Sequence, residues 1–166
     1  NSPYDVGLLP LESTVLTVTD GSGNTSTCEA QVSVLDTIRP VAQCQNATVS
    51  LNGSGSGTLT TSQVNNGSSD NCTSPANLGL QLSATAFTCG SVGTQNVTLT
   101  VTDESGNTHA CTSTVTIQDL VAPSAICRNV TVYLDGTGNG STTGAAVSNG
   151  SSDACGILSL SLTQTS

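Results

Sequence analysis

With 166 residues the chain is long enough for one large domain or two small ones. It has only three aromatic side chains and no Trp or Met, so any core must be built from aliphatic side chains and cystine. Eleven acidic residues against two Arg and no Lys give a formal net charge of −9, which repels nucleic acid and anionic membranes. We therefore expect no nucleic-acid partner, and no direct membrane insertion, because no apolar run approaches the roughly 18 residues of a membrane span.

The cysteine content indicates an extracellular setting. Seven Cys, abundant Ser and Thr, and many Asn-x-Ser/Thr triplets are typical of an oxidising compartment, in which disulfides persist. We therefore interpret the chain as secreted or cell-surface. Its first residues, NSPYDVGLLPLES, lack a basic region followed by an apolar run, so we expect any signal or anchor to lie outside this sequence.

The sequence repeats itself with a period of about 83 residues, a length that predicts tandem domains. VLTVTDGSGNTSTC at 15–28 returns as TLTVTDESGNTHAC at 98–111, and residues 14–72 align without a gap with 97–155. The alignment pairs cysteines of the two periods: Cys28 with Cys111, Cys44 with Cys127, and Cys72 with Cys155. We expect two periods of a longer array.

Each period predicts β-strands, because apolar residues alternate with Ser or Thr and no 3.6-residue spacing is sustained. One such strand has Cys28, Ala30, Val32 and Val34 at alternate positions, so these four side chains are expected to face inward together. In CQNATVSL, residues 44–51, the expected inward set is Ala47, Val49 and Leu51. Cys44 has the opposite phase, which predicts a kink near Gln45, and GSGSG at 53–57 predicts the next turn.

The clearest pattern is NVTLTVTD at 96–103, where Val97, Leu99 and Val101 share one face and polar residues share the other. ESGN at 104–107 is the predicted hairpin turn, and Cys111 should face inward on the strand that follows it. About seven short strands in each period predict an all-β chain of tandem immunoglobulin-like β-sandwich repeats of about 83 residues. Cystines would stabilise so small a core in place of aromatic residues.

Three separated motifs in order carry a resemblance to a known family: DTIRPVAQCQNATVSL, then SSDNC, then FTCGSVGTQNVTLTVTDESGNTHACTSTVTI. They resemble the hyalin repeat, in the form found in tandem in large surface adhesins of Bacteroidota. The resemblance implies one complete β-sandwich repeat at 36–119, the C-terminal half of a repeat at 1–35 and the N-terminal half of the following repeat at 120–166. In the first half, Val6 stands where the pattern has Cys89, so we expect that repeat to lack one disulfide.

The immunoglobulin-like fold implied by this resemblance suggests a disulfide arrangement. Its first and last strands run parallel, so Cys44 and Cys111, each near the start of one of them, are expected to bond. Cys72 and Cys89 remain within the whole repeat, and we pair them. By the same rule Cys28 and Cys127 need partners from neighbouring units. A metal site is disfavoured for these cysteines, because no CxxC occurs and the chain has a single His.

The expected partners are therefore neighbouring copies of the chain, arranged head to tail. Cys127 of one unit would bond to Cys28 of the next, and each mixed domain would be completed in trans, as in donor-strand complementation. The alternative is that these residues are a segment of one long chain that carries many repeats.

Eight sequons fall in predicted turns or on outward strand faces, where a glycan would not enter the core: Asn24, Asn46, Asn52, Asn66, Asn96, Asn129, Asn139 and Asn149. A ninth, Asn71, neighbours a cysteine. The alternative is that Asn and Thr are ordinary residues of turns and exposed strands. In a Bacteroidota source, O-linked sugar on Thr37 would be the rival modification.

Acidic positions recur with the repeat. Asp103 lies among oxygen-bearing residues that calcium uses as ligands, and Asp135, in DGTGNG, has some likeness to a calcium loop. Both are weak calcium candidates, since such clusters are also the usual chemistry of tight turns. Apart from covalent glycans and this calcium, no cofactor is expected.

Nothing in the sequence predicts an enzyme. The single His109 corresponds to Ser26 in the other period, on a predicted outward face, and no nucleophile, base and orienting group are suggested. We therefore expect an extracellular structural module whose domains stack end to end as a stalk or filament. The alternative is an adhesin whose repeats bind glycan or protein ligands directly, for which Tyr133 is the one aromatic expected to be exposed.

Overall fold

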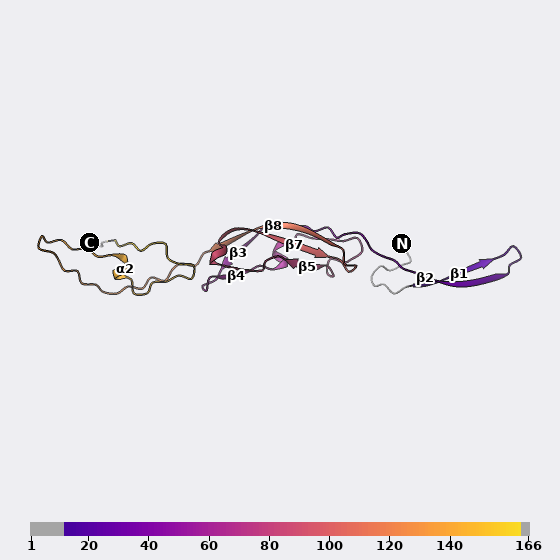
Figure 1. Cartoon of the computed structure of the whole chain (residues 1–166), viewed down its shortest axis with the longest axis horizontal. Helices are drawn as coiled ribbons and strands as arrows, with labels where there is room; N and C mark the ends of the chain where they lie inside the picture. The colour runs from indigo at the N-terminus through magenta and orange to yellow at the C-terminus, as the bar shows by residue number, and fades with distance from the viewer. Residues whose placement is uncertain (1–11, 164–166) are drawn as a thin grey trace. The chain divides into compact units, whose positions relative to one another are not determined.

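The computed structural model describes residues 12–163, and the chain is mostly β within them. Eight strands account for most of its regular structure; the described helices are two α-helices of four residues each and one short 3-10 turn. Figure 1 labels most of these elements and colours the chain from its N-terminus to its C-terminus. Across the described residues, no helix has the length and apolar character needed to cross a membrane.

The first two strands form an antiparallel hairpin. β1 (Glu12–Thr19) pairs with β2 (Thr25–Val32), and Leu16 lies opposite Cys28 in the register. Asp20 builds the turn between them, since its Oδ1 accepts hydrogen bonds from the backbone N–H groups of Ser22 and Asn24 at 2.9 and 2.8 Å. Asp at this position favours a turn because its short side chain can bond to its own backbone two residues on.

A second sheet has four strands in the order β3-β8-β7-β5. These are β3 (Ala47–Leu51), β5 (Gly79–Leu82), β7 (Gly93–Thr102) and β8 (Thr108–Asp119). β3 runs parallel to β8, and β5 runs antiparallel to β7. The predicted turn at 104–107 joins β7 to β8.

The remaining elements are short. β4 (Ser56–Thr58) pairs antiparallel with β6 (Ala86–Thr88) in a separate two-stranded sheet. The helices are α1 (Thr61–Val64), η1 (Cys89–Ser91) and α2 (Gly144–Val147). The chain therefore contains several sheets rather than one.

The chain divides into two compact units. Of the described residues, the first contains 12–45, 61–83 and 98–113, and the second contains 46–60, 84–97 and 114–163. The buried apolar residues of the first are Val64, Leu78, Leu82, Leu99 and Val101. Those of the second are Val49, Leu51, Leu59, Phe87, Val97, Val115 and Ile117. The predicted inward faces of β3, β7 and β8 are thus largely buried, because alternate side chains of a strand point to one side.

Candidate functional site

Two disulfides are the most definite chemical feature of the chain. The first joins Cys44 to Cys111, as the resemblance suggested, with a sequence separation of 67 and a distance of 5.8 Å between their Cα atoms. Cys111 lies on β8, and Cys44 lies just before β3, where its backbone bridges to Asn65. Disulfides of this kind indicate an oxidising environment.

The second disulfide corrects the pairing expected for Cys72 and Cys89. Cys89 bonds instead to Cys155, at a sequence separation of 66. Cys155 lies in a turn where its backbone N–H donates to Asp153 Oδ1 at 2.7 Å. The sulfur of Cys89 lies against Gly55, where an added side-chain carbon would come within 2.6 Å of it. The bond therefore links cysteines of successive periods rather than of one period.

A sequence signal for this pairing was present. Cys72 lies one period before Cys155, which bonds to Cys89. The equivalent partner of Cys72 would therefore lie one period before Cys89, where the chain has Val6 instead of a cysteine. Cys72 is accordingly a free thiol in the structure. Val6 itself, and the disulfide expected to be missing from its repeat, lie outside the described residues.

Three described cysteines, Cys28, Cys72 and Cys127, are free and exposed. The bond expected between Cys28 and Cys127 of neighbouring units stays a prediction. Desolvation, followed by the charges of nearby aspartates, raises the pKa of the Cys72 thiol. A raised pKa lowers the thiolate fraction at neutral pH, so Cys72 is a weak nucleophile there.

Three aspartates of the first unit converge. Asp36 lies between β2 and β3, Asp70 lies between α1 and β5, and Asp103 directly follows β7. Each offers one carboxylate oxygen to a group whose members all lie within 4.8 Å of one another. The backbone N–H of Thr73 is the main cause that lowers the pKa of Asp70, so this carboxylate is charged at neutral pH.

The two calcium candidates of the sequence have different surroundings. Asp103 belongs to this convergent group and is buried. Asp135 is exposed, and its Oδ1 accepts hydrogen bonds from Thr137 and Asn139 within its own turn. Among the described residues, Asp135 belongs to no group of metal-ligating side chains, so the structure supports the turn interpretation there.

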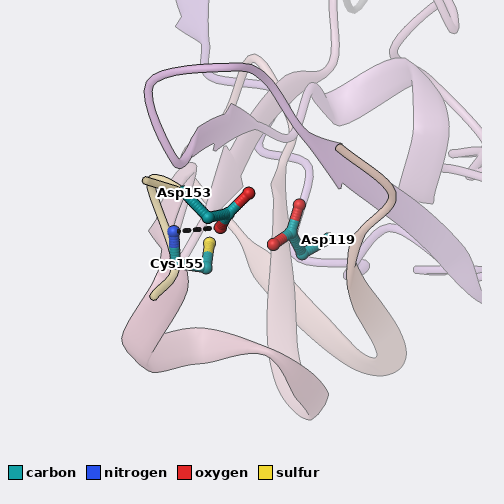
Figure 2. Close-up of side chains that lie close together, drawn as sticks. All are labelled: Asp119, Asp153 and Cys155. Atoms are coloured by element: carbon teal, nitrogen blue, oxygen red, sulfur yellow. Dashed lines mark hydrogen bonds between the residues drawn. The ribbon is translucent and has the colours of Figure 1, made fainter. Parts of the chain in front are cut away.

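A related group recurs one period later in the second unit. Figure 2 shows Asp119 and Asp153 with Cys155. The sulfur of Cys155 is already bonded to Cys89, so only two carboxylates remain as metal ligands. A cavity of about 410 Å³ lies beside Asp153 and is also lined by Gly53, Val121, Ala122 and Ser124.

All nine sequon asparagines are exposed: Asn24, Asn46, Asn52, Asn66, Asn71, Asn96, Asn129, Asn139 and Asn149. A glycan on any of them would not need to enter the core. His109 is exposed too, and its Nδ1 accepts a hydrogen bond from the backbone N–H of Ala42 at 3.0 Å. Tyr133 has 87% of its surface exposed.

In comparisons with known proteins, no protein-family model matches the chain, and no curated protein matches it.

Proposed function

We propose that the chain is an extracellular structural module of tandem immunoglobulin-like repeats, glycosylated and stacked end to end as a stalk or filament at the cell surface. The observation that carries the proposal is the disulfide between Cys89 and Cys155, which ties one period of the sequence to the next. A covalent tie at this place suits a protein whose function is to keep successive repeats together. The likeness to the hyalin repeat, with its boundaries at 36 and 119, is part of this proposal.

Recurring backbone contacts support the tandem arrangement. Val41 bridges to Ser69, and Ser124 bridges to Ser152 in the same antiparallel manner. The second bridge lies one period after the first at both positions. The bridge from Cys44 to Asn65 likewise recurs one period later, from Cys127 to Ser148. Repeat proteins are expected to show such equivalent contacts, since each repeat is one structural unit.

Exposed apolar residues support stacking between neighbours. Leu99 and Val101 are fully buried, whereas their equivalents in the preceding period, Leu16 and Val18, are each 58% exposed. These are core positions that lack the complementary half of a repeat. Residues 120–163 show the same property: Val132 and Leu134 are exposed where their equivalents in β3 are buried. A neighbouring copy that supplies the missing half would remove this apolar surface from water.

The test is a protein in which two copies of the chain are joined in tandem. After oxidation and proteolysis, we expect mass spectrometry to find a peptide that links Cys127 of the first copy to Cys28 of the second. The separate chain should give the same crosslink between molecules if it assembles by itself, and Cys127→Ser should abolish it. Free thiols at both positions in the oxidised tandem protein would contradict the proposal.

The second candidate, an adhesin that binds a ligand directly, is favoured only by the exposure of Tyr133. Exposed aromatic side chains often dominate binding surfaces. Under the structural proposal, Tyr133→Ser should leave attachment of the native protein to cells or glycans unchanged. A large loss of attachment by a variant that keeps its melting temperature would favour the adhesin instead.

A further inference from the structure

The carboxylates of Asp36 and Asp70 are held in fixed orientations. Asp36 Oδ1 accepts a hydrogen bond from the backbone N–H of Ile38 at 2.9 Å. Asp70 Oδ2 accepts two, from the backbone N–H groups of Cys72 and Thr73, both at 2.8 Å. In each residue one oxygen is thus occupied by the local turn, which leaves the other available for a different partner.

The other oxygen of each carboxylate meets no hydrogen-bond donor in good geometry among the described residues, and the one group recorded close to the Asp36 carboxylate is the thiol of Cys72. Asp36 Oδ2 and Asp70 Oδ1 each expose less than 1 Å² to solvent and accept no hydrogen bond. A buried carboxylate oxygen without a hydrogen bond or counter-charge is strongly unfavourable. The repulsion is greater here because Asp103 contributes a third carboxylate within 4.8 Å. The sequence has only two Arg and no Lys to neutralise such a group.

The dimensions fit a calcium ion. Calcium binds oxygen at about 2.3–2.6 Å, so two oxygens on opposite sides of the ion lie roughly 4.6–5.2 Å apart. The three aspartate oxygens lie within 4.8 Å of one another, which allows all of them to contact one ion. The ligands are all carboxylate oxygens, which calcium prefers, whereas zinc prefers nitrogen and sulfur. We infer that Asp36, Asp70 and Asp103 form a calcium-binding site in which water completes the coordination.

The site would join three segments of the first unit: the stretch before β3, the loop before β5 and the end of β7. Asp103 is already fixed by Asn107, whose backbone and side-chain N–H groups donate to its two oxygens at 2.7 and 2.8 Å. The Nδ2 of Asn107 also donates to the backbone oxygen of Asp36 at 3.1 Å. The ion would therefore stabilise an existing arrangement, and the inference does not depend on the proposed filament.

The test is calcium titration of the chelator-treated 166-residue chain by calorimetry, with thermal unfolding at each calcium concentration. We expect a dissociation constant on the order of 10⁻⁴–10⁻³ M, as in extracellular calcium modules, and a melting temperature raised by about 5 °C or more at saturation. An unchanged melting temperature together with no binding heat at about 10⁻² M calcium would overturn the inference.

Asp36→Asn and Asp70→Asn separate ion binding from a structural role. Asparagine keeps one oxygen for the local N–H donors but replaces the unpaired oxygen with an amide nitrogen that cannot bind calcium. We expect each variant to lose at least tenfold in calcium affinity, while its melting temperature without calcium is unchanged or raised because a repulsion is removed. Variants that bind calcium as tightly as the original chain would refute the assignment.

Asp20→Asn is the matched control. Asp20 accepts the same pair of hydrogen bonds from Asn24 that Asp103 accepts from Asn107, but it is exposed and lies outside the group of three. The control should keep the calcium affinity of the original chain. Equal losses in Asp20→Asn and Asp36→Asn would show that binding follows general negative charge, and would overturn the site.

Discussion

At the scale of single residues, Gly57 shows how closely the backbone of β4 approaches β3. A side-chain carbon built at Gly57 would lie 2.6 Å from Val49 Cγ1 and 3.2 Å from Leu51 Cδ2. The same crowding occurs one period later, where a carbon built at Gly140 would meet Val132 Cγ1 at 2.7 Å. Glycine is needed at both positions because no other residue leaves the space free.

We predict that Gly57→Ala destabilises the chain by about 1–3 kcal/mol, since the added methyl group must displace buried side chains. Gly21→Ala is the control, because a side-chain carbon there meets nothing within 4 Å. Guanidinium unfolding followed by circular dichroism measures both. Equal midpoints for the two variants would show that the approach at Gly57 is not tight.

The carboxyl group of Asp135 gives a prediction about pH. Hydrogen bonds from the backbone N–H of Asn139, and next from the Thr137 side chain, lower its pKa below the ordinary 3.8. A lowered pKa means that these bonds stabilise the fold above pH 3.8 and that their contribution is lost as the pH falls through the pKa of the folded state.

We predict that Thr137→Val raises the pKa of Asp135 toward its ordinary value, because the hydroxyl donor at 2.7 Å is removed. Titration of the carboxyl carbon by nuclear magnetic resonance measures the change. Thr137→Ser, which keeps the hydroxyl, should preserve the lowered pKa. If Thr137→Val and the original chain titrate together, the hydroxyl does not stabilise the carboxylate.

At the scale of elements, the disulfide between Cys44 and Cys111 should contribute much of the stability. It closes a loop with a sequence separation of 67, for which the chain-entropy model gives about 4 kcal/mol. We predict a loss of this size for the double variant Cys44→Ser/Cys111→Ser, measured by guanidinium unfolding. Cys72→Ser removes an exposed free thiol and should change stability by less than about 0.5 kcal/mol. Similar losses in both variants would contradict the prediction.

The strands within residues 36–119 could be predicted from the sequence because their signal is local. Val97, Leu99 and Val101 alternate with polar residues, and all three are buried in β7. The turn at 104–107 was predictable for the same reason, since Gly106 adopts a positive φ of 88° that glycine allows. Periodicity and turn chemistry determine such elements within a few residues.

The disulfide of Cys89 and the aspartate group could not be predicted in the same way. Which loop reaches Cys89 depends on the path of residues 120–155, and no local pattern distinguishes Cys72 from Cys155 as its partner. The one signal is distant in the sequence: Val6 stands one period before Cys89, where a partner equivalent for Cys72 would be needed. Asp36, Asp70 and Asp103 are far apart in the sequence and belong to three different loops. The sequence shows that each of these aspartates has an equivalent aspartate one period earlier or later. That the three carboxylates lie close together could be known only from the three-dimensional arrangement of the loops.

At the scale of the whole molecule, the sequons at the surface give a further prediction. In a eukaryotic secretory host we expect glycans on the eight sequons assigned from the sequence. Asn71 should be the least occupied, because its Nδ2 donates to Cys72 Sγ at 2.9 Å. Trimming each glycan to its first sugar should shift the melting temperature by less than about 3 °C, since surface changes rarely affect stability. Peptide mass mapping and calorimetry measure both, and unfolding on trimming would show that the glycans support the core.

The two disulfides also determine how the chain would respond to tension. Their loops overlap, because Cys89 precedes Cys111 in sequence. A load applied across Cys44 and Cys155 would pass through the first disulfide to Cys111, along the backbone to Cys89, and through the second disulfide. Only that backbone stretch, about 80 Å when fully extended, would lengthen, instead of about 400 Å for the uncrosslinked segment. Oxidation thus limits the extended length of this segment to about a fifth of the length that it could reach after reduction of both disulfides.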